Sequence, residues 1–363
     1  MASIPQESVS GPRIIQWYLD TRPLWPVPNH SNPRDEVQQL KTIAARELSL
    51  LTPQEQDSVL KFYHLRDAKT KLASHLLKHY FVTLFSPSLP WSQSAISRDG
   101  MGKPFYRAQA QTQSLEFNVS HQAGLVSLIG AVGFHSSVDV GTDIVCVNER
   151  ASHDDAYISA QGFFAWIDMH ADVFSPPEVS SMKFGPLPLK HLFGSLLPER
   201  RKARVEGYGF DMISRCQRPG DVLKLNVSNS GGSKLNLTVK GTEILALKKR
   251  RFYAYWCLRE AYVKMTGEAL AASWLKELEI SGIRVPLPAP SPKDEDLQDG
   301  EVIKNFKILF RDHLVADVVM ELAALGQDYM ISGAVRGAGG EVQMGRWVRV
   351  ELGDVVGLAE GRV

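Results

Sequence analysis

The clearest helical pattern in the chain covers residues 252–267. Apolar side chains recur there about every 3.6 residues, at Phe252, Tyr255, Trp256 and Val263. This spacing predicts an amphipathic helix packed against a core, and Gly267 supplies a stop because glycine adopts the positive φ of a helix C-terminus. Glu260 and Lys264 stand four residues apart, so they lie one above the other along one edge of the apolar face. A surface ion pair would explain this pair, and so would a functional site that needs an acid and a base.

A second pattern, over residues 138–147, predicts a buried strand that carries an acid. Alternate positions of a strand share one face, here Asp139, Gly141, Asp143, Val145 and Val147. Asp143 interrupts an otherwise apolar run. A carboxylate in such a place needs a cation, hydrogen-bond donors or water.

The remaining hydrophobic patterns predict two halves of the chain, each with both helices and strands. Helical spacing is predicted over 34–85 and 157–173, and strand patterns are predicted over 14–19, 115–121, 124–132, 275–280, 306–309, 315–322 and 329–333. We therefore expect an α+β fold with an N-terminal subdomain at 1–137 and a C-terminal subdomain at 138–363.

Two stretches of the second half lack such patterns. Residues 184–248 combine a basic run with a Ser/Gly/Asn-rich tract, which cannot bury enough apolar surface to offset the entropy of ordering. We expect a partly mobile surface insertion there. The Gly-rich tail around 335–345 is expected to be loop or disorder.

Composition and charge narrow the classes of function. The chain has 363 residues, 44% of them hydrophobic and 22% charged, and a formal net charge of +1. A net charge this close to zero gives the protein no overall positive potential that would attract nucleic acid. An anionic ligand must therefore be held by a local cluster of basic residues. Basic residues gather in this way at Arg66, Lys69, Lys71 and Lys78.

The cysteines and the N-terminus indicate the compartment. Three cysteines show neither metal-type spacing nor an even count for disulfides, which favours reduced thiols. The first residues lack a basic region followed by an apolar stretch, and no run of ~18 apolar residues occurs. We expect a cytoplasmic protein with no membrane span.

The strand and the helix together carry a family signature. The strand contains V-G-T-D at 140–143, and the helix contains W-C-L-R-E-A-Y-V-K at 256–264. This pair, in this order, resembles the signature of the large, Sfp-like 4′-phosphopantetheinyl transferases. Arg259 stands where the family usually has lysine. The resemblance covers about 60–185 and 250–335, and it implies a pseudo-twofold pair of similar α+β subdomains with the active-site cleft between them.

Three further motifs resemble the segments with which this family holds coenzyme A. The R-D-A-K piece at 66–69 implies a phosphate contact by Arg66, although a solvated helix face would also explain the charges. A G-K-P turn implies that Lys103 and Pro104 lie along the cofactor. The F-N-V-S-H motif at 117–121 implies contacts from Ser120 and His121.

The activity implied by the resemblance is transfer of the 4′-phosphopantetheine arm of coenzyme A to a carrier-protein serine, with release of 3′,5′-ADP. Asp143 and Glu260 are then the carboxylates that hold Mg²⁺. Glu260, or a water that it orients, takes the serine proton. Lys264 binds the pyrophosphate as a point charge.

One departure from the bacterial pattern concerns the metal. Val145 stands where many bacterial members have a second acid, so Gln122, Glu178 or water must complete the ligand set. This variant resembles the broad-specificity eukaryotic and fungal branch.

The resemblance also implies the partners. These are apo carrier domains of fatty acid synthase, polyketide synthases, nonribosomal peptide synthetases and the aminoadipate reductase of lysine biosynthesis, served by a monomer that binds neither nucleic acid nor membrane. A different class of function stays open at this point. The chain could be a catalytically inactive, CoA-binding regulator of carrier domains.

Overall fold

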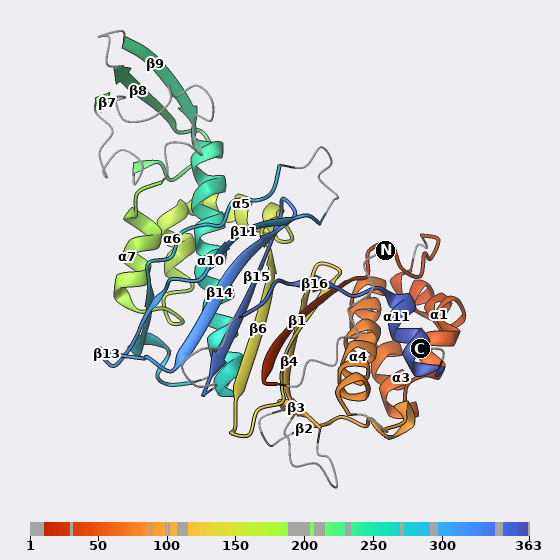
Figure 1. The fold of residues 1–363 in the computed structure, drawn as a ribbon. Helices are drawn as coiled ribbons and strands as arrows, with labels where there is room; N and C mark the ends of the chain where they lie inside the picture. The colour runs from red at the N-terminus through yellow and green to blue at the C-terminus, as the bar shows by residue number, and fades with distance from the viewer. Residues whose placement is uncertain are drawn as a thin grey trace.

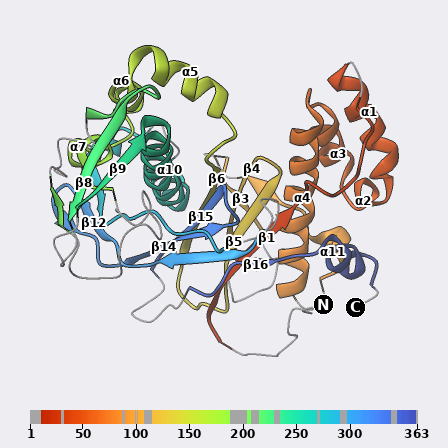
Figure 2. The same ribbon diagram turned by 90° about the horizontal axis from the view of Figure 1, so that it is seen from above.

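The computed structural model of the chain describes residues 11–29, 32–86, 89–98, 100, 102–106, 115–187, 204–206, 215–228, 234–268, 272–290, 297–337 and 344–361. Within these residues, two four-stranded sheets lie between two long helices, α4 (Leu65–Phe85) and α10 (Gly241–Thr266). Figures 1 and 2 show this arrangement from two directions. Helices and several sheets in one chain confirm the predicted α+β class. The twofold relation between the halves and the boundary at 137/138 stay predictions.

The first sheet is built from both ends of the chain. Its order is β16 (Val348–Arg349), β1 (Arg13–Asp20), β5 (Leu125–Val132) and β4 (Glu116–Gln122). β5 runs antiparallel to both of its neighbours, whereas β16 is parallel to β1. The strands predicted at 14–19, 115–121 and 124–132 are confirmed.

The second sheet is antiparallel throughout. Its order is β11 (Asp299–Ile303), β14 (Val318–Leu325), β15 (Tyr329–Arg336) and β6 (Asp139–Cys146). β6 is the strand predicted at 138–147. A small sheet of β10 (Leu278–Ser281), β12 (Lys307–Phe310) and β13 (His313–Leu314) flanks it. The strand patterns at 306–309, 315–322 and 329–333 are thereby confirmed, whereas 275–280 begins with a short 3-10 turn (Leu275–Glu277) before β10.

The two sheets meet where the edge strands β4 and β6 lie side by side (Figure 1). The backbone N–H of Thr142 donates to Asn118 Oδ1 at 3.1 Å, so a side chain takes the place of a ladder hydrogen bond. The V-G-T-D strand and the F-N-V-S-H strand are therefore neighbours in space.

In the first half, α4 is buried on almost every side. The sheet covers one side, and α1 (Pro33–Ile43), α3 (Pro53–Leu60) and α11 (Leu352–Ala359) pack on the others. A Cβ on Gly130 would lie 2.3 Å from the Phe81 ring, so only glycine lets this helix approach β5 so closely. The short helix α2 (Ala45–Ser49), the 3-10 turn η1 (Trp91–Gln93) and the ribbon of β2 (Ser97–Arg98) and β3 (Pro104–Phe105) complete this half.

In the second half, α10 lies against β6 and β15 at a similar glycine contact. A Cβ on Gly141 would stand 2.2 Å from the carbonyl oxygen of Ala261. The predicted stop is confirmed, because Gly267 has φ 82° in the left-handed region. The helical pattern at 157–173 corresponds to α5 (Ala151–Gln161) and α6 (Phe163–Asp168), followed by α7 (Pro176–Phe184).

The helix α10 begins earlier than the sequence pattern indicated. Residues 241–248, which we expected in the mobile insertion, form its first turns, with Ile244 and Lys248 buried. Before it lies a three-stranded ribbon of β7 (Arg204–Glu206), β8 (Val222–Ser228) and β9 (Lys234–Lys240), which extends beyond the helix in Figure 1. The expected mobility at 188–203, 207–214 and 229–233 lies outside the described residues, as does 338–343 of the tail.

The last described segment returns to the first half. β16 adds to β1, and α11 packs on α4 through Val355. Among the described residues, no helix combines the length and the hydropathy needed to span a bilayer.

Candidate active site

The candidate site centres on Asp143 of β6, which is only 5% exposed. Lys264 of α10 places its Nζ 2.6 Å from Asp143 Oδ1. The hydroxyl of Ser120, on β4, donates to the same oxygen at 2.8 Å. Lys264 Nζ also lies 2.9 Å from Ser120 Oγ. The cation and the donor that a buried carboxylate needs thus come from two elements that the sequence had singled out.

Lys264 pairs with Asp143 rather than forming the surface pair with Glu260 that its spacing also allowed. Burial alone would lower the pKa of Lys264, but the Asp143 carboxylate and its hydrogen bond outweigh burial and raise it. Lys264 is therefore a fixed positive charge at the junction of β4, β6 and α10.

Glu260 lies one turn before Lys264 and is half-buried. Burial, followed by the negative charge of Asp143, raises the pKa of Glu260 to about 7, while Lys264 opposes this shift. A carboxyl group with such a pKa exchanges protons readily near neutral pH, which suits a general base. The repulsion between the two carboxylates would also be relieved by a bound cation.

The donor set fits a magnesium ion that keeps much of its own hydration. Within the described residues, no group of three or more His, Cys, Asp or Glu side chains could hold a metal. Asp143 and Glu260 would be its protein carboxylates, and Mg²⁺ commonly binds through one or two carboxylates plus water and substrate phosphate. Gln122, considered above as a further ligand, already accepts from the Cys146 N–H at 3.3 Å through its Oε1.

Glu178, considered above as a further metal ligand, has both of its carboxylate oxygens engaged by protein donors. Its Oε2 accepts from Ser175 N and Oγ and pairs with Arg259, and its Oε1 accepts from Ile280 N at 2.9 Å. These bonds form a capping box that starts α7 and join it to α10 and β10. Because its oxygens are engaged in these bonds, Glu178 holds α7, α10 and β10 together.

Glu178→Gln should therefore cost stability and not metal binding. It breaks a buried ion pair whose Arg259 side chain is fully buried, so we expect the free energy of unfolding to fall by about 3 kcal/mol. Urea denaturation measures this. The exposed Arg46–Glu360 pair is the control, since Glu360→Gln should cost less than about 1 kcal/mol. A Glu178→Gln protein of unchanged stability but altered Mg²⁺ dependence would restore the metal assignment.

The residues expected to contact coenzyme A lie on β4, on β3 and the residue before it, and in the first turn of α4. Ser120 belongs to the cluster itself, and His121 follows it at the end of β4. Partial desolvation, followed by the positive charges of Lys264 and Lys71, lowers the pKa of His121. Lys103 precedes Pro104 of β3, and its side chain extends toward Gly267 at the end of α10. A Cβ added to Gly267 would lie 4.0 Å from Lys103 Cδ.

Arg66 is exposed in the first turn of α4 and contacts the other half of the molecule. Its Nη2 lies 3.0 Å from Oε1 of Glu149, which follows β6, and its Nε lies 3.8 Å from Asp67. The negative charge of Asp67 also acts on His121. The structure thus places Ser120 and His121 near Lys264. Arg66 instead forms an ion pair with Glu149 of the second half.

Sequence reasoning missed the role of Asn118 and the effect of the Lys71 charge on the pKa of His121. Asn118 is the second residue of F-N-V-S-H. A polar residue on the buried face of a strand could have indicated that its side chain makes a structural hydrogen bond. No periodicity in the sequence could have linked the charge of Lys71 to a residue fifty positions later.

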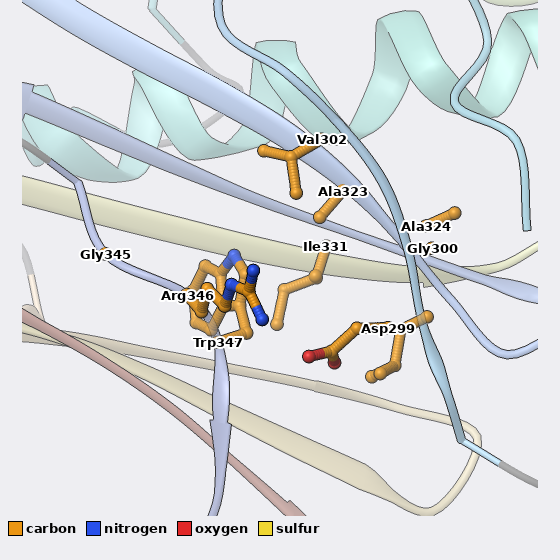
Figure 3. A pocket seen from close by; sticks show the side chains of 10 residues that line it. Asp299, Gly300, Val302, Ala323, Ala324, Ile331, Gly345, Arg346 and Trp347 are labelled. Atoms are coloured by element: carbon orange, nitrogen blue, oxygen red, sulfur yellow. The ribbon is translucent and has the colours of Figure 1, made fainter. Parts of the chain in front are cut away.

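A cavity elsewhere in the molecule is separate from this site. It has a volume of about 210 Å³ and lies between the second sheet and the C-terminal segment, as Figure 3 shows. Apolar side chains such as Ile331 and Trp347 line it, with Asp299 and Arg346 at its edge. Its lining includes none of the predicted site residues.

Two carboxylates, a lysine and a histidine gathered at the junction of two sheets are typical of an enzyme acting on a phosphate-bearing substrate. A family model described as 4′-phosphopantetheinyl transferase, N-terminal, matches residues 39–133. The chain is 35% identical to 4′-phosphopantetheinyl transferase 1 of Fusarium mangiferae, over 97% of each chain. It is also 35% identical to the 4′-phosphopantetheinyl transferase of Aureobasidium melanogenum, over 88% of this chain and 90% of the relative. The chain belongs to the 4′-phosphopantetheinyl transferase family and is an enzyme of that class.

A shorter match concerns a relative with a more specific name. The chain is 25% identical to the L-aminoadipate-semialdehyde dehydrogenase-phosphopantetheinyl transferase of Schizosaccharomyces pombe, over 47% of this chain and 59% of the relative.

Proposed function

We propose that this enzyme transfers the 4′-phosphopantetheine arm of coenzyme A to a serine of apo carrier proteins, in a magnesium-dependent reaction. The serine hydroxyl oxygen bonds to the phosphorus that bears the pantetheine arm. The bond from that phosphorus to the bridging oxygen of the pyrophosphate breaks, and 3′,5′-ADP leaves with the electron pair. The cluster of Asp143, Glu260, Lys264 and Ser120 is the observation that carries this proposal.

Asp143 and Glu260 would hold Mg²⁺, which when bound offsets the negative charge of the phosphate oxygens. Glu260 accepts the proton of the carrier serine, directly or through a water that it orients. Lys264 keeps a permanent positive charge beside the reacting phosphates. Ser120 fixes the orientation of the Asp143 carboxylate through its hydroxyl.

Coenzyme A is proposed to lie along Arg66, Lys103, Pro104, Ser120 and His121. Arg66→Ala and His121→Ala should each weaken CoA binding by roughly 1–3 kcal/mol, because each removes a charge-assisted contact to phosphate. Calorimetry with CoA measures the loss. Arg46→Ala is the matched control, since Arg46 is another exposed arginine paired with a glutamate. Unchanged affinity in both site variants would place the cofactor elsewhere.

The proposed acceptors are carrier domains of fatty acid, polyketide and nonribosomal peptide synthases, together with that of aminoadipate reductase in lysine biosynthesis. The name of the Schizosaccharomyces pombe relative supports the last of these. The three cysteines are free and buried, which supports a reducing, cytoplasmic setting.

The nucleotide released during the reaction tests the proposal. Enzyme, CoA, Mg²⁺ and an apo carrier domain should yield one 3′,5′-ADP per carrier, as measured by ion-exchange chromatography. Release that does not depend on the carrier, or no release at all, would contradict transfer.

A further inference from the structure

The cavity between the second sheet and the C-terminal segment has the size and lining of a small-molecule site. Its volume is about 210 Å³, and most of the side chains that line it are apolar (Figure 3). Ile331 in its wall is fully buried, and Trp347 is 5% exposed. An apolar cavity of about 150 Å³ is large enough to bind benzene, so this one has room for an aromatic or branched aliphatic group.

A β-bulge shapes one wall of the cavity. Asp299 and Val302 are three residues apart in β11, so on a regular strand their side chains would point to opposite faces. The pairing of β11 with β14 shifts in register between these two residues, and both of them line the cavity. Gly300 lies between them, where an added Cβ would stand 2.6 Å from the Leu287 carbonyl oxygen. The bulge therefore brings a carboxylate to an otherwise apolar wall.

Two opposite charges border this cavity without bonding to each other. Asp299 at the start of β11 and Arg346, two residues before β16, both line it, and Figure 3 shows their side chains directed into it. Among the residues that the structure describes, neither side chain has a hydrogen-bond or ion-pair partner. Arg349, on the same segment as Arg346, is by contrast paired with Glu351 at 3.0 Å. The two unpaired charges are thus available to a ligand.

A ligand that satisfies both groups must itself carry both charges. A carboxylate matches the guanidinium of Arg346, which can donate two parallel hydrogen bonds. An ammonium group matches the carboxylate of Asp299. A simple acid would bring its negative charge next to Asp299, and a simple amine would bring its positive charge next to Arg346. An apolar side chain between the charged ends would cover Ile331 and Trp347, as is usual for the apolar part of a bound ligand.

We propose that this cavity binds a free α-amino acid with an apolar side chain. The carboxylate of the amino acid lies on Arg346, its ammonium group lies on Asp299, and its side chain packs against Ile331 and Trp347.

This site lies on the face of the second sheet that α10 does not cover. Ile331 packs in the core with Trp347, whereas its neighbour Met330 packs in the core that contains α10. Adjacent residues of a strand point to opposite faces. Binding in the cavity is therefore independent of Glu260 and of the proposed transfer reaction.

Calorimetry with L-phenylalanine and two analogues tests the class of ligand. 3-Phenylpropionate lacks the ammonium group, and phenethylamine lacks the carboxylate. L-Phenylalanine should bind one to one and ~10–100-fold more tightly than either analogue, the scale of one charge-assisted contact. Equal affinity for the three compounds, or no binding of either L-phenylalanine or L-leucine, would overturn the proposal.

Two substitutions test which residue holds which charge. Asp299→Asn should weaken L-phenylalanine by ~10–100-fold without weakening 3-phenylpropionate. Arg346→Gln should weaken L-phenylalanine by the same factor without weakening phenethylamine. Arg349→Gln is the matched control, since Arg349 is another exposed arginine of this segment, and it should leave all three affinities unchanged. Site variants that bind L-phenylalanine as tightly as the control does would contradict these contacts.

The fluorescence of Trp347 tests whether the ligand enters this cavity. L-Leucine does not fluoresce, so a change in protein emission during its titration reports on a nearby tryptophan. The change should disappear in Trp347→Phe, which keeps an aromatic wall, while calorimetry still detects L-leucine binding. An emission change that persists in Trp347→Phe would place the amino acid at another site.

Discussion

Asp143→Asn and Glu260→Gln are each expected to lower kcat for transfer by at least about 100-fold while the protein stays folded. Both changes keep the size of the side chain and remove its negative charge. Asp143→Asn leaves Lys264 opposite a neutral group. Glu260→Gln removes the carboxylate that is proposed to accept the serine proton and to help hold Mg²⁺.

Circular dichroism and kcat at saturating Mg²⁺ together check this expectation. Asp139→Asn is the matched control, because Asp139 is a carboxylate on the same strand that pairs with Arg336 instead of the site. The control should keep near wild-type turnover. A folded Asp143→Asn or Glu260→Gln protein with wild-type kcat would remove that residue from the mechanism.

Gly141→Ala should damage both stability and activity. The added Cβ would stand 2.2 Å from the Ala261 carbonyl oxygen and 2.3 Å from the Met265 nitrogen, both in the backbone of α10. Because backbone cannot rotate away, the helix must shift, at a cost of about 3 kcal/mol or more. The shift also moves Glu260 relative to Asp143, and a displacement of about 1 Å can reduce turnover by ~100-fold.

Denaturation curves and kcat measured on one preparation check both effects. Gly353→Ala is the control, because a Cβ at Gly353 meets nothing within 4 Å. If Gly141→Ala were as stable and active as the control, the close contact between β6 and α10 would not position the site.

The site helix and strand were predictable because each carries a strong local signal. The apolar spacing at 252–267 and the stop at Gly267 depend on neighbours within one helix. The acid in an apolar strand at Asp143 required a partner, and the structure supplies Lys264 and Ser120. Their meeting depends on tertiary packing, and the family resemblance had assigned Ser120 to coenzyme A and Lys264 to the pyrophosphate instead.

The start of α10 was missed because its first turns contain charged residues that are buried. Lys248 is 1% exposed and donates to the Cys216 carbonyl oxygen at 2.9 Å. Arg251 donates to the carbonyl oxygen of Gly185 at 2.6 Å. Carbonyl partners so distant in sequence leave no periodic pattern, so the segment resembled a surface loop.

The structural role of Glu178 was indicated in the sequence, but we interpreted this residue as a possible metal ligand. The S-x-x-E spacing from Ser175 to Glu178 is the signature of a capping box at the start of a helix. The departure at Arg259 has the same explanation, because its guanidinium pairs with Glu178 and donates to the Leu275 and Leu278 carbonyl oxygens. Both residues hold α7, α10 and β10 together.

The mass of an apo carrier domain tests the central claim most directly. Incubation with this enzyme, CoA and Mg²⁺ should increase the mass of the carrier by one phosphopantetheine group, located on its acceptor serine by peptide fragmentation. A carrier with that serine replaced by alanine should keep its mass, as should a reaction with the Glu260→Gln enzyme. An unchanged wild-type carrier, with an enzyme that binds CoA normally, would contradict transfer as the function of this site.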